Sequence, residues 1–409
     1  MIRHQVYFDT LGSMKEDSAS WRSVFAGLSV LRLVDAYVEA GSGAPAVNWA
    51  QVHSVRAALE NVAEGDPVRG VLTNVLEEAL SRATVDDAVC VALLAYGRAL
   101  DYEASWGLAT DVFTTVAKFV RPEKNARLAV EANVSVGGAA RRNGDWDTSA
   151  RAYSQAAYIA DTMGDRKGVL TVQVGIANTY MAKGNLPQAQ AILDDVIVQA
   201  KDQEFNDIQG KALHSRAALA ARKGENAEGL KTAHEALELT SSSGERDLLL
   251  EDIAAMFMEL GLHDSARDAH LILLGSAQNR LARWTATVNL MELASLDGME
   301  DAFRNYAREL ATSPLGPWAR AHHLLFFGEG LARFGHIDDA ESVLLEASAF
   351  CDANQFHQLA FKAQSALTAL KTTAREMKPF TPPPAYVVEE VSGVVRAISE
   401  LRKTAAATP

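Results

Sequence analysis

The stretch Tyr180-Met181-Ala182-Lys183-Gly184-Asn185-Leu186-Pro187-Gln188-Ala189 contains a turn that recurs along this chain. The intervals between the turn glycines are 40, 40, 37, 37 and 37 residues, and these glycines are Gly144, Gly184, Gly224, Gly261, Gly298 and Gly335. A fixed period of this length is typical of a stacked array, in which each helical unit buries its apolar face against its neighbours. The period therefore predicts an all-α solenoid. It does not identify a ligand, because a repeat scaffold determines a surface and not what that surface binds.

Two positions around each turn glycine are predicted to lie where helices approach closely. Small residues predominate there, which permits tight packing, and large residues nine positions after the glycine are expected to fill the adjoining space. Seven positions before the glycine stand Gly137, Ala177, Ala217, Ala254, Met291 and Gly328; five positions after it stand Ser149, Ala189, Gly229, Ala266, Phe303 and Ala340. A slip of one residue restores alanine in two units, at Ala150 and Ala302, and the large residues include Tyr153, Leu193 and Leu344.

This pattern resembles the tetratricopeptide repeat (TPR) family, whose helix-turn-helix units combine a small residue, a large apolar residue, a turn glycine and an alanine. The clearest match is Ile176-Ala177, Tyr180, Gly184 and Ala189. The resemblance covers about six units over residues 123–370 and extends weakly toward residue 50. The chain departs from the family at the position of its tryptophan, and its period exceeds the usual 34 residues. The tryptophan position holds Asn133, Gln173, Leu213 or Leu250. The resemblance implies a right-handed α-solenoid with a concave groove lined by the first helix of each unit.

The remaining segments are inferred from periodicity and from breaks in it. Apolar residues near the end step by 4, 3, 4 and 3 positions, which is typical of one helix face; they are Val387, Val391, Val394, Ile398 and Leu401. Residues 101–105 echo residues 145–149 at an interval of 44. We expect an N-terminal arm or loose cap over 1–20, degenerate helical repeats over 21–122, the array over 123–370, a proline-rich connector over 371–385, an amphipathic helix over 386–402 and a disordered tail over 403–409.

Composition limits the possible partners. The formal net charge of -13 argues against a general nucleic-acid binder, which needs a basic surface to displace counterions from phosphates. The chain has two cysteines, Cys90 and Cys351, far apart in sequence, so a disulfide framework is not indicated and a reducing compartment fits. No segment has the length and apolar character of a membrane span or a signal peptide. We expect a cytoplasmic protein without a membrane or nucleic-acid partner.

Motifs for catalysis, for a cofactor or for a metal are not evident in the sequence. There is no phosphate-binding glycine loop, no H-E-x-x-H and no paired-cysteine motif. The adjacent His322 and His323 point about 100° apart on a helix, so they cannot ligate one metal together. Cys351 and His357 lack an indicated orienting group, and a core cysteine is the simpler interpretation. We therefore expect no enzyme, no cofactor and no metal.

The candidate binding site is the polar lining of the groove that the resemblance implies. Positions 3, 6, 10 and 13 residues before each turn glycine share one helix face. They select Glu131, Arg141, Thr171, Asn178, Lys211, His214, Glu251, Glu292, His322 and Glu329. The set runs from basic residues, at Arg141 and Lys211, to acidic ones at Glu251, Glu292 and Glu329. A peptide acidic at one end and basic at the other would be complementary. A face of merely solvated residues is the alternative.

Three functions remain open on the sequence alone. The first is a non-enzymatic scaffold that binds a protein or peptide in the groove. The second is a regulator that resembles the sensor halves of bacterial peptide-responsive proteins and acts on a partner in trans. The third is self-association through residues 386–402. That helix is expected to cap the last repeat, to fill the groove or to pair with another chain, and we favour capping because an array needs a terminal shield.

Overall fold

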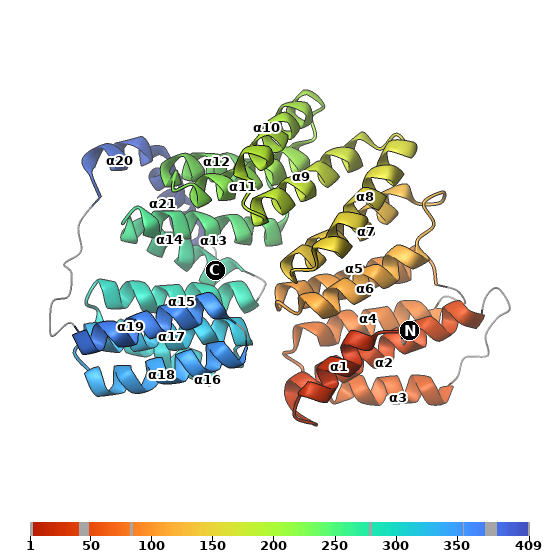
Figure 1. The fold of residues 1–409 in the computed structure, drawn as a ribbon, viewed down its shortest axis with the longest axis horizontal. Coiled ribbons are helices and arrows are strands. Elements are labelled where there is room, and N and C mark those ends of the chain that lie inside the picture. Colours follow the sequence, from red (N-terminus) through yellow and green to blue (C-terminus); the bar gives the residue numbers. More distant parts are fainter. Residues whose placement is uncertain are drawn as a thin grey trace. The chain divides into compact units, whose positions relative to one another are not determined.

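The computed structural model describes residues 3–40, 49–81, 85–277, 280–354, 356–372 and 383–407. The regular structure of this described part is helical, without any strand, which confirms the all-α prediction (Figure 1). The chain divides into two compact units, residues 1–192 and residues 193–409.

Unit 1 is built from consecutive helices that pack on their neighbours in sequence. The helix α10, Leu186–Asp202, crosses the boundary into the second unit. The helices before it are α1 (Gln5–Ser13), α2 (Ala19–Ala40), α3 (Trp49–Glu60), α4 (Pro67–Ser81), α5 (Asp87–Tyr102), α6 (Trp106–Phe119), α7 (Ala126–Arg142), α8 (Trp146–Thr162) and α9 (Arg166–Ala182).

Unit 2 continues the helical pairs and then adds two C-terminal helices. Its helices are α11 (Asn206–Arg222), α12 (Asn226–Leu239), α13 (Ser243–Glu259), α14 (His263–Ser276), α15 (Arg280–Leu296), α16 (Glu300–Thr312), α17 (Pro317–Arg333), α18 (Ile337–Ala353), α19 (His357–Thr372), α20 (Ala385–Glu390) and α21 (Ser392–Ala407).

The turn that defines the period is a left-handed cap at the end of the first helix of each pair. Gly184 has φ 81°, and the other five turn glycines have φ between 71° and 84°. After α9, Gly184 N–H donates to the carbonyl of Met181 at 3.1 Å and Asn185 N–H donates to that of Tyr180 at 2.9 Å. These two bonds form a Schellman motif, which satisfies carbonyls that the helix end leaves free. Glycine recurs because a side chain strains the left-handed conformation.

The turn between α5 and α6 is of the same kind but lacks glycine, so the sequence did not reveal it. Ala104 has φ 58°, and Ser105 N–H donates to the carbonyl of Leu100 at 2.9 Å. This turn between α5 and α6 is the conformational equivalent of the turn at Gly144. The corresponding interval is 40 residues, so the predicted echo at 44 residues is wrong in register. The reason is that alanine conceals a left-handed position that glycine would mark.

The predicted packing positions lie in the core. Ala177, Ala189 and Leu193 are fully buried, and a Cβ added to Gly137 would meet the Tyr153 ring at 2.7 Å. The interpretation of a one-residue slip is wrong, since Ser149 is buried and Ala150 is exposed. Ser149 keeps the position because its hydroxyl donates to the carbonyl of Gly137 at 2.9 Å. In the other unit Phe303, and not Ala302, is the fully buried residue, and the backbone of Gly330 gives its ring room.

The helices of each unit form two layers. The first helices of the pairs contact one another in succession: α5, α7 and α9 in unit 1, and α11, α13, α15, α17 and α19 in unit 2. We call these the A helices. Their partners, which we call the B helices, are α6 and α8 in unit 1 and α12, α14, α16 and α18 in unit 2. The A helices correspond to the lining that the sequence predicted.

The N-terminus is an anchored helix, so the prediction of an arm over 1–20 is wrong for α1. His4 contacts two carboxylates, Asp111 through Nδ1 at 2.5 Å and Asp35 through Nε2 at 3.2 Å. Tyr7 is fully buried and donates to the Tyr96 hydroxyl at 3.0 Å. Burial lowers the pKa of His4, but the hydrogen bonds and charges of the two carboxylates outweigh it and raise the pKa to about 9. The anchors come from α2, α5 and α6, which the local pattern cannot indicate.

The C-terminal helix packs on the B helices α12 and α14, as Figure 1 shows for α12 and α21. Val391, Val394 and Ile398 join the apolar core formed by α11 to α15, which confirms the predicted stripe. Lys231 on α12 forms an ion pair of 2.8 Å with Glu390. The favoured prediction that this helix caps the last repeat is therefore wrong. In the described part of the chain, α21 packs on B helices and does not lie along the A helices. The reason is that its apolar stripe packs against the apolar surface of an earlier repeat, formed by α12 and α14.

The last segments differ from the prediction in extent. The helix α21 continues to Ala407, so the tail predicted to be disordered over 403–409 is helical over 403–407. The proline-rich connector predicted for 371–385 falls mainly on residues 373–382, which lie outside the described residues, as do residues 408 and 409.

Candidate functional site

All ten residues predicted to line the inner face lie on A helices. Nine are half-buried and Lys211 is exposed. Glu131 and Arg141 are on α7, Thr171 and Asn178 on α9, Lys211 and His214 on α11, Glu251 on α13, Glu292 on α15, and His322 and Glu329 on α17. The first four belong to unit 1 and the other six to unit 2.

The basic residues of unit 1 are engaged within the chain. Arg141 lies against Tyr153, its Nε is buried without a hydrogen-bond partner among the described residues, and burial lowers its pKa. Arg142 donates to Asp101 through Nε at 3.0 Å, and Arg98 pairs with Glu131. Arg141 is therefore a packing residue more than a free cation. In the described part of the chain, no hydrogen bond engages the side chain of Asn178.

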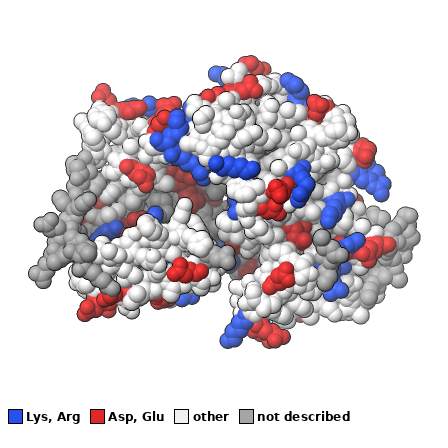
Figure 2. Space-filling view, viewed as in Figure 1, with Lys and Arg blue, Asp and Glu red and all other residues white. Residues whose placement is uncertain are grey.

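The basic residues of unit 2 are neutralised by the next A helix. Lys211 Nζ lies 3.1 Å from Glu245, and His214 donates from Nε2 to Asp252 at 2.8 Å. Both acids are on α13, where the repeat places them opposite α11. The predicted gradient from basic to acidic is therefore wrong in its basic half: the cations are present but already paired. Figure 2 shows acidic and basic side chains intermixed on the face it presents.

Glu251 on α13 is a half-buried carboxyl. Among the described residues neither a hydrogen bond nor an ion pair reaches it, and Asp252 beside it is bound to His214. Burial raises the pKa of Glu251 to about 7, and repulsion from Asp252 and Asp247 adds to this effect. The carboxyl is thus partly protonated near neutral pH, and a nearby cation would favour its ionised form.

A second carboxyl group of this kind lies between α15 and α17. Burial raises the pKa of Glu292 to about 7; Arg333 and the exposed Lys362 of α19 oppose the shift, and Glu329 contributes to it. Arg333 donates to Ser295 at 2.8 Å and to Glu329 at 3.3 Å, so its guanidinium is shared. Glu259, which is exposed on α13, also lies within electrostatic reach of Glu292. We call Glu259, Glu292 and Glu329 the carboxylate site.

An aromatic surface adjoins this site along α17, and the sequence interpretation did not include it. Trp318 is 41% exposed; its ring centroid lies 4.6 Å from that of His322 and 5.4 Å from that of Phe356, which immediately precedes α19. His322 also contacts Phe326 at 5.8 Å. Residues 318, 322, 326, 329 and 333 step by 4, 4, 3 and 4 positions, which places the aromatic surface and Glu329 on one face of α17. The stripe was visible in the sequence, but its approach to Phe356 depends on the fold.

The candidates for metal or nucleophilic chemistry are core residues. His323 is buried, stacks on Phe327 at 5.7 Å, and has a pKa lowered to about 4 by burial. His322 faces differently and donates from Nδ1 to the carbonyl of Trp318 at 3.1 Å. Cys90 and Cys351 are free and buried, and burial raises the pKa of both thiols. Within the described residues, no cluster of three His, Cys, Asp or Glu side chains is arranged to hold a metal ion.

The fold defines the chain as an α-solenoid of helix-turn-helix repeats with TPR-like turns. No protein-family model matches the sequence, and no curated protein matches it. Among solved structures, NprR in complex with its cognate peptide NprX has a TM-score of 0.47 at 13% identity and covers 76% of this chain and 97% of its own. A Rap protein complexed with competence and sporulation factor has a TM-score of 0.32 at 13% identity and covers 90% and 99%. At these TM-scores the likenesses do not identify a ligand for this chain.

None of the described helices combines the length and the apolar character needed to span a bilayer.

Proposed function

We propose that this chain is a non-enzymatic, peptide-binding scaffold and that the A helices of unit 2 bind a segment carrying a cationic side chain. The observation that supports this most is the carboxylate site beside the aromatic surface. Glu259 and Glu292 offer negative charge on α13 and α15. Glu329 on α17 shares the guanidinium of Arg333, and Trp318 and Phe356 offer apolar contact. A lysine or arginine next to an aromatic or aliphatic residue would satisfy both features.

The raised pKa of Glu292 gives the proposal a measurable signature. A bound cation stabilises the ionised carboxyl, so binding at neutral pH should release a proton. Affinity should rise as the pH increases through about 7, because more of Glu251 and Glu292 is then ionised. At about 4 Å and an effective dielectric constant of about 20, attraction between unit charges is about 4 kcal/mol before desolvation is subtracted.

A binding role accounts for these carboxyls better than catalysis does. Glu251 on α13 is perturbed by Asp252 and Asp247, whereas Glu292 on α15 is perturbed by Arg333 and Glu329. The two therefore do not form a coupled acid and base pair of the kind that catalytic sites use. The Schellman turns and the buried small residues support membership of a divergent TPR group. The free buried thiols of Cys90 and Cys351 support a cytoplasmic location.

The test is selection from a random peptide library displayed on phage. The baits are the wild-type protein, the variant Glu259→Gln/Glu292→Gln/Glu329→Gln and a control variant, Asp301→Asn/Glu309→Gln/Asp338→Asn. Both variants replace three carboxyl groups, but the control residues are exposed on the B helices α16 and α18. We expect the wild type and the control to select peptides with a cation next to an apolar residue, and the first variant to lose them.

Equal selection by all three baits would remove the carboxylate site from the function. Peptides that bind best at about pH 6, with affinity falling toward about pH 8, would contradict the role of ionised Glu251 and Glu292. Calorimetry in two buffers of different ionisation enthalpy measures the released proton directly.

A regulatory role in trans is the second candidate, and the position of α21 favours it. The B helices α12 and α14 that hold α21 are the partners of α11 and α13, which carry Lys211, His214 and Glu251. A ligand that shifts these A helices therefore acts on the surface beneath α21. Hydrogen exchange of residues 392–407 with and without a selected peptide tests this role; unchanged protection would argue against it.

A further inference from the structure

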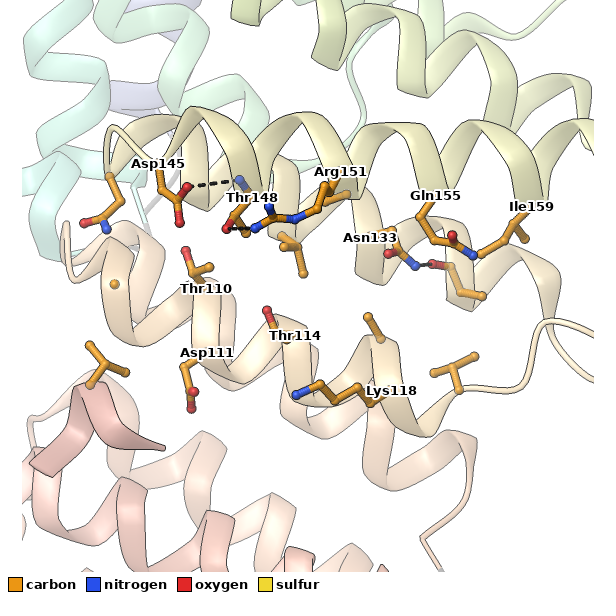
Figure 3. Close-up of a pocket in the computed structure, with 18 of the residues that line it drawn as sticks. Thr110, Asp111, Thr114, Lys118, Asn133, Asp145, Thr148, Arg151, Gln155 and Ile159 are labelled. Atoms are coloured by element: carbon orange, nitrogen blue, oxygen red, sulfur yellow. Dashed lines mark hydrogen bonds between the residues drawn. The ribbon is translucent and has the colours of Figure 1, made fainter. Parts of the chain in front are cut away.

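A trench on the B helices of unit 1 is a second candidate binding site, separate from the carboxylate site of unit 2. It lies between α6 and α8, with α7 as its floor, and has a volume of about 880 Å³ (Figure 3). Ala129 and Val136 of α7 form the apolar part of the floor, and Val6 of α1 closes one end. Sites for small molecules and short peptide segments typically have this size.

The length of the trench suits an extended peptide. One face of α6 lines it from Gly107 to Lys118, and one face of α8 lines it from Thr148 to Ile159. At a rise of 1.5 Å per residue, each wall is about 16 Å long. An extended chain rises about 3.3 Å per residue, so about five residues would fill the trench lengthwise.

The trench has one cationic side chain on each of its two walls. Lys118 on α6 is exposed and forms no ion pair in the described part of the chain. Arg151 on α8 donates to the neutral hydroxyl of Thr148 at 3.0 Å. Of the two carboxylates that line the trench, Asp111 is paired with His4, whereas Asp145 is exposed and keeps its negative charge while it accepts a hydrogen bond from the backbone N–H of Thr148 at 3.0 Å. Asp145 also lies close enough to Arg151 for that cation to help lower its pKa, after the larger effect of Thr148.

Neutral hydrogen-bonding groups also line the walls and the floor of the trench. Figure 3 shows the side chains of Thr110 and Thr114 directed from α6 toward α8, with Asn133 on the floor and Gln155 on the opposite wall. Within the described residues, no hydrogen bond engages the hydroxyl of Thr114 or the amide of Gln155. Such groups match the backbone amides and carbonyls of an extended segment.

We propose that this trench binds an extended polypeptide segment with acidic side chains, which contact Lys118 and Arg151 from opposite walls. The charge preference is opposite to that of the carboxylate site, and the two walls of the trench are B helices of unit 1. The proposal for the trench therefore does not depend on the function proposed for unit 2. A binder of this kind holds one acidic segment on unit 1 while unit 2 binds a cationic one.

Fluorescence anisotropy with defined peptides tests the trench in the full-length protein. The probe is a labelled peptide of alternating glutamate and leucine, and its control replaces every glutamate with glutamine. The protein variants are Lys118→Gln/Arg151→Gln and the single exposed change Lys118→Glu. The matched control is Lys124→Gln/Arg127→Gln, which removes two exposed cations of unit 1 that do not line the trench. Circular dichroism checks that every variant is folded.

We expect the acidic probe to bind the wild type at least tenfold more tightly than the glutamine peptide. Both trench variants should weaken it at least tenfold, and the matched control should stay within about twofold. Higher salt should weaken binding of the acidic probe, because the contacts are charged. Inorganic phosphate and ATP are added as competitors. The proposal is overturned if the acidic probe does not bind, if the trench variants bind it as the wild type does, or if ATP binds there and the peptide does not.

Discussion

The buried His4 at the start of α1 should make unit 1 more stable at acidic than at alkaline pH. Asp111 and Asp35 raise its folded-state pKa to about 9, compared with 6.5 in the unfolded chain. A raised folded pKa means that the folded protein binds the extra proton more tightly. The stabilisation is fully present below about pH 6.5 and is lost as the pH rises through about 9. At 1.36 kcal/mol per pKa unit, the difference corresponds to about 3 kcal/mol.

The perturbation is His4→Gln, which keeps a polar side chain but cannot carry the charge. We expect the difference in unfolding free energy between wild type and variant to be about 3 kcal/mol larger at about pH 6 than at about pH 9.5. Urea unfolding followed by tryptophan fluorescence and by circular dichroism measures this difference. Exposed His53 on α3 supplies the matched control, His53→Gln, which should show no such pH dependence. A wild-type-to-variant difference that is equal at both pH values would refute the assignment of a charged His4.

Three further predictions concern single structural features. Gly184→Ala should destabilise the protein by about 1 kcal/mol because Gly184 has a φ of 81°. Ala104→Gly should stabilise it by about 0.5 to 1 kcal/mol, because glycine relieves the strain of a φ of 58°. Thermal or urea unfolding measures both changes in unfolding free energy, and changes of the same sign would contradict the shared turn geometry. His270 is fully buried, with its pKa lowered to about 4 by burial, so its unfolded form binds a proton between about pH 6.5 and 4 and stability falls there. His270→Met should reduce that acid-induced loss by up to about 3 kcal/mol, measured by urea unfolding at about pH 7 and 4.5, and an unchanged loss would count against a neutral His270. Ile398→Asp should release α21 from α14, because a charge would replace a fully buried side chain, and limited proteolysis should then cut residues 392–407 faster than in the exposed control Arg396→Asp.

The sequence predicted the features that depend on neighbours a fixed number of residues away. The six turns were predicted because each first helix ends in a left-handed residue, and glycine is the residue that adopts this conformation most easily. Ala177 and Leu193 were recognised as core residues because the turn fixes their distance from it. The turn at Ala104 was not predicted, because Ala104 adopts the left-handed conformation without being a glycine.

The features that depend on contacts between distant residues were not predictable. Counting from the glycine placed Arg141 and Lys211 on the A helices, but it did not show that Tyr153 covers the first and Glu245 pairs with the second. The trench was missed because it depends on the separation of α6 from α8. A helix pattern determines which face a residue occupies, and only the fold determines what that face meets.

The attachment of α21 to α14 has a consequence for the order in which unit 2 is made. Solenoid repeats generally fold by adding each new repeat to the one before it, so earlier repeats can settle while later ones are still being synthesised. Here Val391, Val394 and Ile398 complete an apolar core that begins some 180 residues earlier, at Leu213. The surface of α12 and α14 therefore stays uncovered until residues 392–407 have left the ribosome. During that interval the nascent chain presents an apolar surface that chaperones can recognise.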